Sequence, residues 1–180
     1  MKPDEVDFDN LSFSFTKTKS MYVAKCEQKS QWEIGELVPF SNLSLSPAAT
    51  VLNYGQGLFE GMKAYKWNNG KIAMFRPERN AKRAANSCKR LSMPEIPEAL
   101  FLDAVKKVVR DNAGYIPNTK QGALYVRPII FGSGEGVGVA PSTEYMFIVY
   151  VSPVGPYFKG KLKPIKLVVT NEYHRAPLKG

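Results

Sequence analysis

The stretch from Leu52 to Tyr65, LNYGQGLFEGMKAY, combines three glycines with two tyrosines and one phenylalanine. Glycine lets the backbone approach a ligand or another chain closely and permits positive φ angles. Aromatic side chains supply rigid apolar walls, and tyrosine adds a polar tip. The stretch is therefore interpreted either as the edge of a pocket or as a buried strand entered through a glycine turn. Composition alone favours the strand, since glycines inside strand patterns usually mark bulges or close packing.

A β-hairpin is predicted directly after this stretch. Apolar residues at 64, 65 and 67 precede Asn68-Asn69-Gly70, and apolar residues at 72, 74 and 75 follow. Asn-Gly between two apolar runs is a strong hairpin signal, because the tight turn needs positive φ at both central positions. Strands are also predicted on the N-terminal side of the stretch, at Met21–Cys26 and Gln31–Phe40.

Two helices are predicted after the hairpin. The first opens at Arg76-Pro77-Glu78, because proline is tolerated in the first turn and an acidic residue suits the positive helix end. We expect it to reach about Leu91 and to end before Pro94. The second, from about Pro97 to Asn112, carries apolar residues at 100, 101, 104, 105, 108 and 109, which form one stripe at helical spacing.

The last third of the chain alternates predicted strands with segments rich in glycine and proline. Strands are expected at Gly122–Phe131, Tyr145–Val151 and Pro164–Thr170. Arg127 stands inside an apolar run, so it is either a buried, paired arginine or a ligand contact, since unpaired charge is costly to bury. No helix-forming stretch follows the glycine-rich loop Gly132–Val139, which argues against a dinucleotide site.

Composition and charge exclude several classes of function. The 180 residues carry a formal net charge of +9, but the basic residues are scattered among acidic ones, which argues against a nucleic-acid partner. The apolar runs are too short to cross a bilayer, so no membrane partner is expected. With one histidine, His174, and two distant cysteines, Cys26 and Cys88, no structural zinc site can be assembled.

Five motifs in order, LNYGQGLFEGMKAYK, FRPERNAKR, LYVRPIIFGSGEGVGVAP, FIVYVSPVGPYFKG and EYHRA, resemble the branched-chain amino acid aminotransferases. These are pyridoxal phosphate enzymes of fold type IV, and the likeness, from about Asp7 to Arg175, is closest to the plant-type branch. The order and spacing of all five motifs are highly specific, whereas any one alone is weak.

The resemblance implies an α/β fold of the D-amino acid aminotransferase-like kind. A small N-terminal α/β domain would cover residues 1–154, an interdomain linker 155–160, and the start of the cofactor-binding domain, with its first strand, 161–180. The prolines and glycines between Ser152 and Gly160 agree with a linker.

The resemblance also implies site residues at matching positions. Arg83 matches the arginine that binds the cofactor phosphate, a role that suits its guanidinium fork, although a surface arginine of a helix is the alternative. Tyr54 and Phe59 match pocket walls that receive the aliphatic side chain. Tyr125 and Arg127 match the pair that lines the substrate site and helps to accept the far carboxylate of glutamate.

Four further residues of the chain match family positions. Val139 matches an apolar contact that reaches the neighbouring subunit's active site, and Tyr157 matches an aromatic of the loop that closes over substrate. Lys63 matches a peripheral position near the pocket mouth, and Arg175 matches a position just before the catalytic segment. Lys179 does not match the catalytic lysine, because its spacing and its flanking residues differ.

The implied activity is transamination with pyridoxal 5'-phosphate, in which the amino group of leucine, isoleucine or valine passes to 2-oxoglutarate and gives glutamate. The family works as a homodimer. The Schiff-base lysine is expected beyond Gly180, so we assign no catalytic residue and expect the 180-residue chain alone to be inactive.

The alternative is an inactive, truncated paralogue that associates with full-length subunits. The expected location is the cytoplasm, or a plastid or mitochondrion if a transit peptide precedes the chain.

Overall fold

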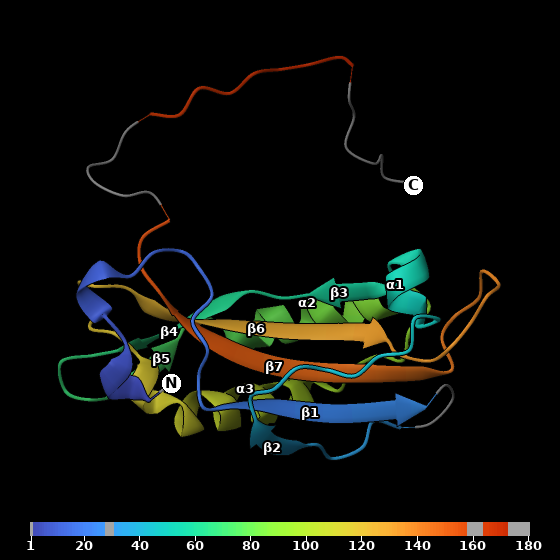
Figure 1. Cartoon of the computed structure of the whole chain (residues 1–180), viewed down its shortest axis with the longest axis horizontal. Coiled ribbons are helices and arrows are strands. Elements are labelled where there is room, and N and C mark those ends of the chain that lie inside the picture. Colours follow the sequence, from blue (N-terminus) through green and yellow to red (C-terminus); the bar gives the residue numbers. More distant parts are fainter. Residues whose placement is uncertain (1, 28–30, 158–163, 173–180) are drawn as a thin grey trace.

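The computed structural model describes residues 2–27, 31–157 and 164–172. A seven-stranded antiparallel sheet carries two long helices on one face, whereas extended segments cross the other (Figure 1). The strand order is β2-β1-β7-β6-β4-β5, and β3 also pairs with β6. The strands are β1 (Ser20–Glu27), β2 (Glu36–Pro39), β3 (Gly57–Phe59), β4 (Met62–Lys66), β5 (Ile72–Met74), β6 (Ala123–Gly132) and β7 (Glu144–Val154). The helices are α1 (Thr50–Tyr54), α2 (Pro77–Arg90) and α3 (Glu98–Asp111), with 3-10 turns η1 (Pro3–Glu5), η2 (Phe8–Asn10) and η3 (Ala113–Tyr115).

The main core lies between the sheet and the helices α2 and α3. Successive side chains of a strand point to opposite faces, so alternate residues of β6 and β7 enter this core. The contributors from these two strands are Leu124, Val126, Ile130, Tyr145, Phe147, Val149 and Val151. The ring of Phe101 on α3 stacks on that of Phe147, with centroids 5.7 Å apart. The intervening residues of β6, including Tyr125 and Arg127, therefore belong to the opposite face, which we call the open face.

The stretch at Leu52–Tyr65 forms a short helix, a turn and two strands in line. Gly55 ends α1 in the left-handed conformation, with φ of 65°, and its N–H donates to the carbonyl of Val51. Strands β3 and β4 then pair with β6 in a single register, separated by Glu60 and Gly61. The N–H of Glu60 donates to the carbonyl of Pro128 at 2.8 Å, but proline has no N–H to return the bond. The ladder is therefore interrupted at Glu60 and Gly61, between the end of β3 at Phe59 and the start of β4 at Met62.

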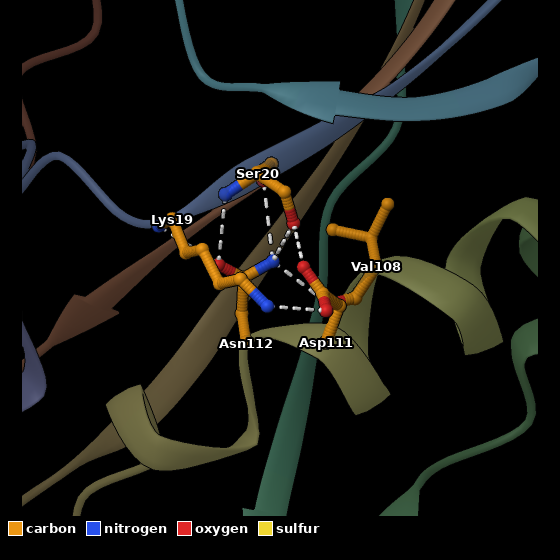
Figure 2. A network of polar contacts seen from close by, with 5 residues as sticks. All are labelled: Lys19, Ser20, Val108, Asp111 and Asn112. Atoms are coloured by element: carbon orange, nitrogen blue, oxygen red, sulfur yellow. Dashed lines mark hydrogen bonds and ion pairs between the residues drawn. The ribbon is translucent and has the colours of Figure 1, made fainter.

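A buried polar network fastens the end of α3 to the start of β1 (Figure 2). The side-chain oxygen of Asn112 accepts from the backbone N–H groups of Lys19 and Ser20, at 3.0 and 3.2 Å. Its amide nitrogen donates to the carbonyl of Val108 and to both oxygens of Ser20. Asp111 accepts from Lys19 Nζ at 2.7 Å and from the hydroxyl of Ser20 at 2.5 Å, and these two hydrogen bonds hold the pKa of the Asp111 carboxyl below its usual range.

The predicted helices and hairpin are confirmed, with three differences in detail. Only Gly70 of the hairpin turn has positive φ, at 79°, because the loop is longer than the two-residue turn that the Asn-Gly signal predicts. The strand predicted at Gln31–Phe40 is shorter, at Glu36–Pro39. Helix α1 was not predicted, since five residues are too few to show helical periodicity.

The predicted strand at Pro164–Thr170 is not formed, and residues 164–170 carry neither helix nor strand. A strand needs a hydrogen-bonding neighbour, and no strand of the described residues pairs with this segment. His174, Arg175 and Lys179 lie outside the described residues.

Candidate active site

Three of the residues expected in the site form one cluster on the open face. The guanidinium carbon of Arg127 lies 4.2 Å from the ring centroid of Phe59 and 5.1 Å from that of Tyr125. Its Nη2 donates to the hydroxyl of Tyr125 at 2.8 Å. The register of β3 and β4 along β6 brings these side chains together, because Gly61 stands between the two strands opposite Arg127. A side chain at position 61 would have to displace Tyr125, since an added Cβ would lie 2.3 Å from the Tyr125 hydroxyl.

Within the described part of the chain, the charge of Arg127 is not paired with a carboxylate. None of the ion pairs among residues 2–27, 31–157 and 164–172 includes Arg127, and its Nε is buried without a hydrogen-bond partner in that part of the chain. A buried donor without a partner costs free energy, and a carboxylate is the natural acceptor for a guanidinium. The cluster therefore offers a positive, partly desolvated group inside an aromatic frame.

Two cavities meet at Arg127. One, of about 280 Å³, is lined mainly by apolar groups, among them Val51, Phe59 and Ile129. The other, of about 140 Å³, is lined by Tyr125 and by residues of the N-terminal segment and β7, among them Phe13 and Tyr150. An apolar surface beside a single positive group can receive either an aliphatic side chain or a carboxylate.

Tyr157 packs against Phe13, which lines the second cavity. The ring of Phe13 packs edge to face on Tyr125 and on Tyr157, with centroid distances of 5.6 and 5.2 Å. Tyr157 is 69% exposed, as expected for an aromatic at the rim of a site. The structure thus connects the residues of β3 and β6 with the segment that follows β7.

Tyr54 and Val139 lie at a different place, around the loop between β6 and β7. The hydroxyl of Tyr54 donates to the carbonyl of Val137, and both Val137 and Val139 are exposed. Tyr54 ends α1, and Val51 of the same helix lines the apolar cavity. Tyr54 is thus linked to the apolar cavity only through its helix, and among the described residues neither Tyr54 nor Val139 makes a hydrogen bond or ring contact with Arg127.

Arg83 lies on α2 and is tied to the residue after Phe59. Its Nε and Nη2 donate to the two carboxylate oxygens of Glu60 at 2.7 and 2.6 Å. This pairing raises the pKa of the Arg83 guanidinium above its usual value. Arg83 borders a groove of about 380 Å³, which is also lined by the polar side chains of Asn86, Ser87 and Arg90 and by the apolar ones of Leu58 and Leu91.

Glu60, Gly61 and Phe13 were not identified as site residues from the sequence. A lone glutamate or phenylalanine carries no local signal of its function. The signal for Gly61 was its place in the glycine-rich stretch, which indicated a close approach but not its partner.

Among the described residues there is no group of three or more histidine, cysteine, aspartate or glutamate side chains that could hold a metal ion. In the same part of the chain, no helix has the length and apolar character needed to span a bilayer.

Known proteins with the same sequence pattern are aminotransferases. Residues 57–178 match the family described as amino-transferase class IV. The chain is 50% identical over 172 residues to branched-chain amino acid aminotransferase 2, chloroplastic, of Humulus lupulus, covering 96% of this chain and 42% of that protein. It is 45% identical over 179 residues to the branched-chain-amino-acid aminotransferase of Helicobacter pylori, covering 98% of this chain and 52% of that protein.

Solved structures share the fold. The branched-chain amino acid aminotransferase of Escherichia coli superimposes with a TM-score of 0.62 at 25% identity, over 78% of this chain and 41% of that one. The T.th. branched-chain amino acid aminotransferase complexed with N-(5'-phosphopyridoxyl)-L-glutamate has a TM-score of 0.55 at 28% identity, over 74% of this chain and 41% of that one. The chain spans about half or less of the length of these relatives. Fold and sequence together place the chain in the class IV aminotransferase family.

Proposed function

We propose that this chain supplies the substrate-facing part of a branched-chain amino acid aminotransferase. The reaction would move the amino group of leucine, isoleucine or valine to 2-oxoglutarate through pyridoxal phosphate. Arg127 carries this proposal, because it is a cation without a carboxylate partner among the described residues, framed by Phe59 and Tyr125 beside an apolar cavity. The names of the relatives support the same activity.

The site would accept two chemically different substrates in turn. The aliphatic side chain of leucine, isoleucine or valine would lie against Phe59 and the apolar lining of the 280 Å³ cavity. The far carboxylate of glutamate would bind Arg127 and the hydroxyl of Tyr125, whose hydrogen bond holds the guanidinium in place. One methylene group changes the binding free energy in such a pocket by about 1–3 kcal/mol. This value limits how well the pocket can discriminate between leucine, isoleucine and valine.

The residues present fit the phosphate of the cofactor. Glu60 occupies the Nε and Nη2 edge of Arg83, which leaves three N–H groups of this exposed side chain at the border of the groove. Arg83 would therefore hold the phosphate. When bound, pyridoxal phosphate supplies the electron sink for proton removal beside the amino group. The part of the chain described here would orient the substrate and exclude water from it with Phe59, Tyr125 and Tyr157.

We further propose a homodimer and an organelle location. Val139 is 89% exposed, which suits an apolar contact with the neighbouring subunit. Plant relatives are named as chloroplastic or mitochondrial, which supports a plastid or mitochondrion. The division into a small domain over 1–154, a linker over 155–160 and a cofactor domain from 161 remains part of this proposal.

A chimaeric enzyme tests the proposed function. The matching part of the Helicobacter pylori relative would be replaced by this chain, and glutamate formation from leucine and 2-oxoglutarate would be measured. We expect transamination of leucine, isoleucine and valine above that of alanine. Replacing Arg127 with Leu should raise the KM for 2-oxoglutarate more than tenfold, with a smaller effect on the KM for leucine, because only the former loses a charged partner.

A folded chimaera without transamination would overturn the proposal. An equal change in both KM values for R127L would overturn the role of Arg127 alone. Lys106→Leu is the matched control, since Lys106 is exposed on α3, which covers the other face of the sheet, and none of the ion pairs among the described residues includes it.

A further inference from the structure

We propose that Glu60 is a positioning residue, which aims Arg83 at the phosphate of the cofactor. This inference rests on the proposed function. It gives a role to a residue to which the family resemblance assigned none. It links the two parts of the site, because Glu60 follows Phe59 directly in the chain.

The carboxylate of Glu60 is buried and fully engaged. Its side chain is 4% exposed, whereas that of Arg83 is 67% exposed. Oε1 accepts from Arg83 Nε at 2.7 Å, and Oε2 accepts from Arg83 Nη2 at 2.6 Å. Oε2 also accepts from Asn80 Nδ2 at 2.8 Å. A bidentate pair of this kind fixes the plane of the guanidinium as well as its distance.

The backbone of Glu60 is held as firmly as its side chain. Its N–H donates to the carbonyl of Pro128 on the central strand β6. Asn80 donates a second bond to the carbonyl of Gly61, so one amide clamps both residues of the interruption between β3 and β4. The carboxylate is therefore held rigidly by the sheet, and it fixes the orientation of the long Arg83 side chain of α2.

The pairing leaves one edge of Arg83 free for a ligand. An arginine has five N–H donors, and Glu60 takes the one on Nε and one of the two on Nη2. The remaining Nη1 and Nη2 hydrogens form the second fork of the guanidinium, the geometry that matches two phosphate oxygens. Among the described residues, Nη1 of Arg83 donates no hydrogen bond.

Positioning and simple electrostatics predict opposite results when Glu60 is neutralised. A negative charge beside Arg83 weakens the attraction for an anion, so removing it would tighten phosphate binding if charge alone mattered. If Glu60 acts by holding the fork in place, its loss releases a flexible side chain and weakens binding. The sign of the effect therefore separates the two accounts.

The experiment follows Arg83 itself in the 180-residue chain. The Nε–H resonance of Arg83 would be observed by nitrogen-15 NMR during titration with inorganic phosphate, and then with pyridoxal phosphate and with pyridoxal, which lacks the phosphate. We expect Arg83 to respond to both phosphates and not to pyridoxal, whereas Arg79, one turn earlier on α2, does not respond. Glu60→Gln should weaken phosphate binding at least tenfold.

Two more variants complete the test. Glu78→Gln removes the same charge from the first turn of α2 without touching Arg83, so its phosphate affinity should stay within twofold. Asn80→Ala keeps the charge of Glu60 but removes one of its donors, so it should weaken binding several-fold even if E60Q folds poorly. Unchanged or tighter binding in E60Q and N80A would overturn the positioning role alone. No response of Arg83 in the unaltered chain would overturn both that role and the assignment of Arg83 to the phosphate, while the chimaera still tests the activity.

Discussion

Single residues decide the shape of the Arg127 cluster, and Gly61 is the most constrained. An alanine Cβ at position 61 would lie 2.3 Å from the hydroxyl and 3.1 Å from Cζ of Tyr125. We expect Gly61→Ala to displace Tyr125 from Arg127 and to lower the free energy of unfolding by about 1–3 kcal/mol, as overpacking does. Urea denaturation and the Nε–H resonance of Arg127 would measure both effects. At Gly138 an added Cβ meets nothing within 4 Å, so G138A is the control. If G61A proves as stable as G138A with its Arg127 resonance unmoved, the close approach is wrong.

Cys88 makes the stability of the fold sensitive to alkaline pH. Burial on α2 raises the pKa of its thiol from 9.0 to about 11. A raised pKa in the folded state means that the stabilisation is complete below about pH 9 and is lost as the pH rises toward 11. Between pH 8 and about pH 10.5, the unfolding free energy of the unaltered chain should fall by ~2 kcal/mol more than that of Cys88→Ala. Parallel pH curves for the two proteins would show that Cys88 ionises normally.

At the scale of elements, the network of Figure 2 joins α3 to the sheet. Asn112 is fully buried and satisfies two backbone N–H groups of the residues that enter β1. Replacing it with Ala leaves these donors without partners, at about 1–3 kcal/mol for each such group. We expect Asn112→Ala to lower the unfolding free energy by about 2–4 kcal/mol in a denaturant titration. Asn86→Ala, an exposed change on α2, should stay within about 0.5 kcal/mol. Equal stabilities of the two variants would show that α3 is held by apolar packing alone.

At the scale of the whole molecule, exposed apolar side chains and a high net charge have opposite effects on self-association. Phe59 and Val139 are 63% and 89% exposed, which favours association, whereas the net charge of +9 opposes it. Salt screens the charge, so sedimentation should show more association at about 0.5 M salt than at low ionic strength. Serine at both positions should shift the chain toward the monomer. Serine at Trp67, exposed on the hairpin, is the control and should change little. Association that weakens with salt would contradict this account.

The sequence by itself determined the family and most of the local elements, with the short helix α1 and the segment 164–170 as exceptions. Some signals act over only a few neighbouring residues, so they can be recognised from the sequence alone. They are the apolar stripe of α3, the proline at the start of α2 and the Asn-Gly turn. The five ordered motifs likewise identified the family without knowledge of the tertiary structure. Arg127 was recognised as an arginine that needs a partner, because a charge inside an apolar run is unusual in any fold.

Only the tertiary structure decided which partner each of these residues has. Glu60 and Arg83 are 23 positions apart, and Tyr125 meets Gly61 only because β4 pairs with β6 in one particular register. Asn112 and Ser20 are 92 positions apart. Such pairings depend on strand register and on how a helix packs across a sheet, and a shift of one residue would turn each side chain to the other face. No local sequence pattern indicates the strand register or the helix packing, because both are set by the packing of the whole core.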